Sequence, residues 1–171
     1  MRGAVWDESI SAYLLLLNDA GYHIGKTYKV WSPGTPSDPP YGGQKYTFQK
    51  AGGRFNKFSK NVTKLLESGK TVEDSKAELY GEVRANFKDF LNAREPGKPF
   101  CYWFGPTNVH RSWTAGSGKK LWNIDPDDLK GRMPAYLPDV PEVCDDFASW
   151  TSIFTGMEIA LRLGLWQTSQ V

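Results

Sequence analysis

Apolar residues recur with helical spacing in two stretches of the chain. Across Ile10–Ala20 they fall on one face, and Gly21 follows where a left-handed C-cap is favoured. The second stretch follows Thr71, which can cap a helix together with Asp74. Its apolar stripe consists of Tyr80, Val83, Phe87, Phe90 and Leu91. The pattern therefore predicts two amphipathic helices.

Each predicted helix leads into a predicted strand. Tyr22–Trp31 alternates apolar and polar residues imperfectly, and Ser32–Gly34 ends it. Phe100–Phe104 is the continuous apolar run that is typical of an interior parallel strand. A helix, a glycine turn and a strand, found twice, indicate the α/β class with a mainly parallel sheet.

The remaining segments show weaker patterns. Ser32–Lys60 is rich in Gly, Pro and aromatic residues without a regular period, and we interpret it as a surface loop beside a site. Val62–Lys70 is compatible with a helical turn. Four prolines in Asp125–Pro141 exclude a long helix there. The tail Glu142–Val171 has helix-compatible patches at 143–147 and 157–163.

Composition places the chain among globular proteins of about one domain. It has 171 residues, of which 40% are hydrophobic, 23% charged and 14% aromatic, including seven tryptophans. The net charge of +2 comes without a basic stripe or a nucleic-acid-binding motif, so nucleic acid is not an expected partner. The run Leu14–Leu17 is too short to span a membrane, and the first residues do not form a signal peptide.

Candidate chemistry lies after the second predicted strand. His110 and Arg111 stand in a polar turn there, and a strand that ends in a loop with a histidine is how open α/β sheets build reactive sites. The alternative is a surface or structural histidine. Cys101 and Cys144 have no metal-type spacing, and the sequence leaves open a disulfide between them.

Three segments, in order, resemble the sulfatases of the alkaline-phosphatase-like superfamily. They are Leu17–Pro33 with the sequence LNDAGYHIGKTYKVWSP, Phe100–Trp113, and Asp125–Asp146 with its LPDVPEV run. The resemblance covers about residues 4–150, and 151–171 form a divergent tail. It implies that 1–171 is part of a sulfatase catalytic domain, an incomplete portion of an α/β/α sandwich with a mainly parallel central sheet.

The resemblance implies roles for two residues. Lys29 matches the lysine that contacts the sulfate, where a fixed ammonium stabilises negative charge on the oxygens. His110 matches the histidine that hydrogen-bonds the sulfate near the leaving oxygen. Trp31, Arg111 and Trp113 are the expected substrate-binding residues. The substrate class is a sulfate ester, with sulfated glycans as the suggested natural form.

The chain also departs from the family pattern. Neither Cys101 nor Cys144 stands in the Cys-x-Pro/Ala-x-Arg context that is converted to formylglycine. The calcium-ligand segments have no counterpart, and the pairs Asp127–Asp128 and Asp145–Asp146 are interpreted as solvated or helix-capping charge. Calcium and formylglycine are thus expected in the complete family enzyme, with no support from residues of this chain. We expect the chain alone to be inactive, and whether it is itself an enzyme stays open.

Other interpretations remain. A noncatalytic module that binds sulfated carbohydrate would use the same lysine, histidine and aromatic residues. A phosphatase or phosphonate hydrolase of the same superfamily is a third alternative. The family is commonly secreted, periplasmic or lysosomal, but the compartment of this protein stays open. An incomplete sheet would expose apolar strand edges, which predicts self-association.

Overall fold

The structure is a computed structural model, and the residues that it describes are 13–29, 43–107 and 114–149. The helices are α1 (Tyr13–Asp19), α2 (Phe58–Glu67), α3 (Val72–Asn92) and α4 (Ser117–Trp122), and residues 141–149 are also helical. Short 3-10 helices are η1 (Gly43–Tyr46), η2 (Arg54–Lys57) and η3 (Pro126–Leu129). The strands are β1 (His23–Tyr28) and β2 (Phe100–Gly105).

The chain forms two compact units, each built from two separate stretches. Unit 1 comprises residues 1–53 and 84–107, and unit 2 comprises 54–83 and 108–171. The boundary between residues 83 and 84 falls inside α3, so this helix contributes to both units.

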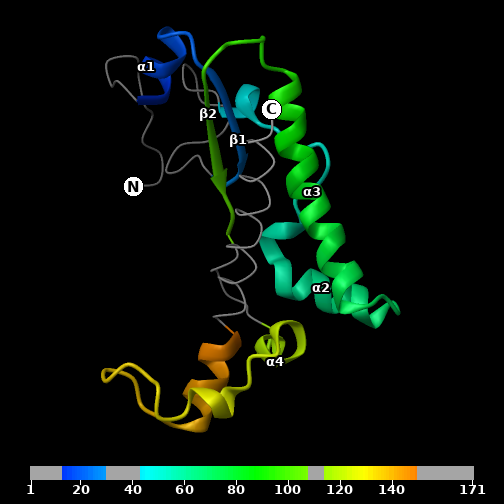
Figure 1. The fold of residues 1–171 in the computed structure, drawn as a ribbon, viewed down its shortest axis with the longest axis vertical. Helices are drawn as coiled ribbons and strands as arrows, with labels where there is room; N and C mark the ends of the chain where they lie inside the picture. The colour runs from blue at the N-terminus through cyan, green and yellow to red at the C-terminus, as the bar shows by residue number, and fades with distance from the viewer. Residues whose placement is uncertain (1–12, 30–42, 108–113, 150–171) are drawn as a thin grey trace. The chain divides into compact units, whose positions relative to one another are not determined.

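Unit 1 is organised around a parallel pair of strands. Strand β1 pairs with β2 in the register that sets His23 beside Phe100 and Tyr28 beside Gly105. Figure 1 shows the two strands side by side, with the C-terminal part of α3 alongside them. Helix α1 leads into β1 through Gly21, which has φ +86° and whose N–H donates to the Asn18 carbonyl at 3.0 Å.

One face of the sheet packs on aromatic rings of α3. The Phe90 ring lies 4.7 Å from the Tyr102 ring and 4.6 Å from the His23 ring between centroids, and the Phe87 ring lies 4.8 Å from that of Tyr102. Gly25 of β1 faces the Phe90 ring, and a Cβ at this position would overlap the ring. Gly25 therefore allows the helix to approach the sheet closely.

The buried face of α3 is not purely apolar. Leu79 and Phe90 are fully buried on it, but so are Ser75 and Asn86, and Glu82 is also buried. Thr71 begins the helix: its Oγ1 accepts from the Asp74 N–H at 3.0 Å and donates to the Asp74 carboxylate at 2.7 Å.

Unit 2 has an aromatic core of its own. Phe55 and Phe58 are buried, and the Phe58 ring stacks on Tyr80 and on Trp122 at centroid distances of 5.3 and 6.0 Å. Arg54 forms ion pairs with Glu82 and, at 2.7 Å, with Glu78. These pairs hold η2 to the first half of α3.

Most predicted elements are confirmed. The helices near Ile10–Ala20 and after Thr71 are present as α1 and α3, both strands exist and pair in parallel, and the described chain is a mixed α/β structure. In Asp125–Pro141 the longest regular element is the short η3, as the prolines predict. Residues 10–12, 30–42 and 150–171 lie outside the described residues, so predictions there stay predictions.

Two sequence interpretations were wrong in part. Ser32–Lys60 is not a loop throughout, because η1, η2 and the start of α2 fall within it. Its composition, rich in Gly, Pro and aromatic residues, gave no periodic signal for these short helical turns, of which η2 buries Phe55. Strand β2 is not fully interior: Phe100 and Trp103 are about two fifths exposed.

Candidate site at the carboxyl end of the strands

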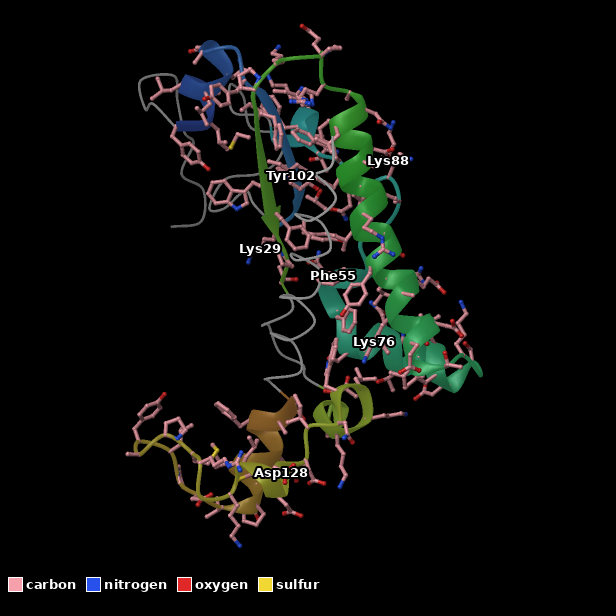
Figure 2. All side chains as sticks on the ribbon, viewed as in Figure 1. Lys29, Phe55, Lys76, Lys88, Tyr102 and Asp128 are labelled. Carbon is pink, nitrogen blue, oxygen red and sulfur yellow. The ribbon has the colours of Figure 1, made fainter. Side chains whose placement is uncertain are left out.

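Lys29 lies at the carboxyl end of the parallel strands. It follows β1 directly, its backbone N–H donates to the Gly105 carbonyl at the end of β2 at 2.9 Å, and its side chain is exposed. Figure 2 shows Lys29 at this end of the strand pair. The carboxyl ends of parallel strands are where open α/β sheets bind ligands, so the lysine occupies a suitable position for an anion.

The residue before Lys29 has an unusual backbone. Tyr28 has φ +69°, in the left-handed region that a bulky L residue rarely adopts. Its N–H donates to the Gln49 side-chain oxygen at 3.2 Å, and its ring packs edge-on against Phe104 at 5.5 Å. These contacts hold the chain in a sharp turn that presents Lys29, and such backbone strain is concentrated at functional sites.

The segment around Thr47 and Phe48 covers the outer edge of β1. Thr47 forms a bridge with Lys26, the Phe48 N–H donates to the Lys26 carbonyl at 2.9 Å, and the Thr27 hydroxyl donates to the Phe48 carbonyl at 2.7 Å. Residues 47 and 48 of the predicted loop are thus fixed to the sheet.

Asn86 fixes the next residues of that segment. From α3, its Oδ1 accepts from the Ala51 N–H at 3.0 Å, and its Nδ2 donates to the Gly52 carbonyl at 2.9 Å. Asn86 is fully buried, and each of its two side-chain polar atoms has a partner. It thereby gives a side-chain partner to the Ala51 N–H and the Gly52 carbonyl, two backbone groups of this segment.

Lys26 is a buried charged residue of the strand pair. Its side chain is only 7% exposed, and burial lowers the pKa of its ammonium. Within the residues that the structure describes, this ammonium has no ion-pair partner. A buried unpaired ammonium costs stability, and it stands three residues before Lys29.

Two other side chains of unit 1, Tyr102 and Cys101, have pKa values that burial shifts towards the neutral form. Burial raises the pKa of the Tyr102 phenol, although its hydrogen bond with Thr27 Oγ1 lowers it. Burial also raises the pKa of the half-buried Cys101 thiol. A raised pKa favours the protonated thiol, which is a poorer nucleophile than the thiolate.

Of the five predicted site residues, the structure places only Lys29. Trp31, His110, Arg111 and Trp113 lie outside the described residues, so their predicted roles stay predictions. Cys101 and Cys144 are free thiols in the structure.

The described residues do not fit a calcium site. Residues 13–29, 43–107 and 114–149 contain no group of three or more Asp, Glu, His or Cys that could hold a metal ion. Asp125 pairs with Lys119 at 2.7 Å, which lowers the pKa of its carboxyl group, and its side chain also caps η3. Asp127 and Asp128 are exposed, as expected for solvated charge.

Sequence reasoning missed the residues that shape the turn before Lys29. Tyr28, Gln49 and Asn86 belong to no motif, and their roles depend on contacts between distant segments. The one available signal was Asn86, a polar residue on the apolar face of a strong helix pattern.

Comparisons with protein-family models, with curated proteins and with solved structures find no match to this chain. No described helix is both long enough and apolar enough to cross a membrane.

Proposed function

We propose that the chain is a portion of a sulfatase, one that in complete form hydrolyses sulfate esters, and that Lys29 contacts the sulfate. The observation that carries the proposal is the position of Lys29. An exposed ammonium follows β1 directly, and its N–H is bonded to Gly105 at the end of the parallel neighbour. A strained Tyr28 precedes it. The segment Phe100–Trp113, which resembles the family, continues past Gly105 to His110.

The chemistry of the proposed contact is electrostatic. Cleavage of a sulfate ester increases negative charge on the sulfate and leaving oxygens, and a fixed cation stabilises that charge. His110 would donate a hydrogen bond close to the leaving oxygen. The nucleophile and the calcium ligands of the family have no counterpart here, so the chain supplies part of a site. An alkaline-phosphatase-like sandwich is the fold this proposal implies.

Binding of an aryl sulfate tests the role of Lys29. We expect the amide signals of Lys29 and Gly105 to shift on titration in NMR spectra. Lys29→Ala should weaken binding about tenfold, because a hydrogen bond to a charged group contributes on the order of 1.5 kcal/mol. Lys88→Ala is the control, since Lys88 is an exposed lysine of α3. Equal affinity of the two variants would refute the contact.

Turnover tests the claim that the chain lacks a nucleophile. We expect no release of sulfate from the aryl ester by the chain with added calcium. Turnover that disappears in Lys29→Ala would contradict that claim and make the chain itself an enzyme. Binding of a sulfated oligosaccharide that is indifferent to calcium, without turnover, would favour the carbohydrate-binding alternative.

A further inference from the structure

Residues 54–70 of unit 2 carry an excess of positive charge. They include one acidic residue, Glu67, and five basic residues, which gives this segment a net charge of +4 in a chain whose total is +2. The basic residues are Arg54, Lys57, Lys60, Lys64 and Lys70. They stand three to six positions apart, so they form no continuous run in the sequence. The excess becomes a surface feature only when α2 forms.

Three of these lysines lie on one side of α2. Lys60 and Lys64 are one helical turn apart, and Lys57 is the N-cap residue, about one turn before Lys60. All three are exposed, whereas Phe58 and Val62 are buried on the other side of the helix. Lys57, Lys60 and Lys64 therefore form a lysine row along the solvent-facing side of α2.

The lysine row has no acidic partner. The other two basic residues of the segment are paired, Arg54 with Glu78 and Glu82, and Lys70 with Glu78. In the part of the chain that the structure describes, no lysine of the row forms an ion pair, and this includes a pair with Glu67 at the end of α2. The row thus presents three uncompensated charges to solvent.

The position of these charges is unfavourable for α2 itself. Its first turn contains no acidic residue, and Lys57 lies at the N-terminus, where the helix dipole opposes a positive charge. Lys60 and Lys64 repel each other at i,i+4 spacing. By contrast, the first turn of α3 carries Glu73 and Asp74. A bound anion would offset both costs in α2, so the row is suited to anion binding.

We propose that the lysine row binds a sulfated polysaccharide. The row extends over two helical turns, roughly 10 Å at 1.5 Å per residue, so it can contact successive sulfate groups of a polymer. Lysine ammonium groups are point charges on flexible stems, which suits sulfates whose positions vary along a polysaccharide. This inference rests on the proposed function, from which it takes the sulfated ligand, and it adds a contact surface on unit 2.

The surface is less suited to two other kinds of polyanion. An amphipathic helix binds a lipid surface by inserting its apolar face, but Phe58 and Val62 of α2 are buried within the protein. Affinity for nucleic acid depends on the number of phosphates that are neutralised, and three lysines neutralise few. Lipid vesicles and DNA therefore serve as comparisons in the test.

Lysine footprinting on the unaltered chain tests the contact directly. We expect heparin, used as the sulfated polysaccharide, to protect the lysine row from acetylation while Lys88 of α3 stays reactive. Protection should decrease as salt rises, because binding releases counterions. A row that heparin leaves fully reactive would refute the proposal. So would equal protection by a DNA duplex or by phosphatidylserine vesicles at the same concentration of anionic groups.

A triple variant tests whether the position of the charges matters. Replacement of all three lysines of the row by Gln, which keeps helix propensity, should weaken heparin binding roughly tenfold or more, in the range expected for three lysine contacts to an anionic surface. The matched control replaces Lys88, Lys120 and Lys130, exposed lysines outside α2, by Gln and removes the same net charge. Equal weakening in the control would show an effect of total charge and overturn the proposal.

The two binding experiments separate this inference from the proposed function. Aryl sulfate binding that depends on Lys29, without heparin protection of the lysine row, would refute the row alone. Heparin protection of the row, with no contact between the aryl sulfate and Lys29, would refute the proposed role of Lys29 and support the row as a polysaccharide contact.

Discussion

At the scale of single residues, burial of the Lys26 ammonium lowers the stability of the folded state. Its ammonium is buried on the strand pair, and burial lowers its pKa below the usual 10.5. The unfolded chain therefore holds this proton more tightly than the folded chain does. Between the folded and unfolded pKa values, the unfolded state binds more protons, so a rise in pH through that range favours folding.

We predict that Lys26→Met raises the melting temperature at neutral pH, because it keeps the apolar stem and removes the buried charge. The gain should shrink as the pH rises towards 10.5, where the wild-type lysine becomes neutral in both states. Thermal unfolding across this pH range measures it. Lys88→Met, at an exposed position of α3, is the control, and an equal gain there would contradict the explanation.

Replacement of Asn86 should lower the free energy of unfolding. Replacement by Leu removes the side-chain partner of the Ala51 N–H and the Gly52 carbonyl; Asn86 itself is fully buried, whereas Ala51 is exposed. We predict a loss of about 1 to 2 kcal/mol in the free energy of unfolding, since each of the two lost hydrogen bonds contributes about 1 kcal/mol. Denaturant unfolding measures the loss. Lys88→Leu on the same helix should change stability little, and a comparable loss there would point to helix propensity instead.

At the scale of elements, glycines decide how closely helices approach their neighbours. A Cβ at Gly25 would overlap the Phe90 ring of α3, and a Cβ at Gly118 of α4 would overlap the Ala148 backbone carbonyl. Neither glycine has a positive φ. The lack of a side chain, and not backbone freedom, is what these positions require.

We predict that Gly25→Ala and Gly118→Ala each lower the free energy of unfolding by about 1 to 3 kcal/mol, the usual cost of overpacking. Gly81→Ala is the matched control: it lies inside α3 with open space around its Cβ position. It should stabilise the protein by up to about 1 kcal/mol through helix propensity. Destabilisation by all three changes would show that close packing is not the cause.

The sequence predicted those elements whose signals are local. The Thr71–Asp74 cap and the apolar stripe of α3 are contained within a few turns, and the apolar run of β2 needs no partner to be recognised. What stayed hidden depends on distant contacts: the left-handed Tyr28, the docking of residues 47–52 on β1, and the buried polar face of α3. Of the candidate site, the sequence placed Lys29 within the predicted strand Tyr22–Trp31. The structure ends β1 at Tyr28, so that Lys29 follows it, and adds the bond to Gly105 and the turn that exposes the lysine.

At the scale of the whole molecule, the chain passes between its two units three times, after residues 53, 83 and 107. Each unit nevertheless has its own set of aromatic contacts. Phe90 and Tyr102 anchor unit 1, whereas Phe58 and Trp122 belong to unit 2. Because the two cores are separate, one unit can unfold locally while the other stays folded.

Trp122 offers a test of that independence. Its ring stacks on Phe58, and the Lys76 ammonium lies 3.8 Å from its centroid. Trp122→Ala should remove both contacts and lower the stability of unit 2 by about 2 kcal/mol, less than for a fully buried Trp because this ring is only partly covered. Hydrogen exchange should then accelerate in α2 while the amides of β1 keep their protection. Equal acceleration of exchange in α2 and in β1 would contradict this prediction. It would mean that the two units unfold as one cooperative structure.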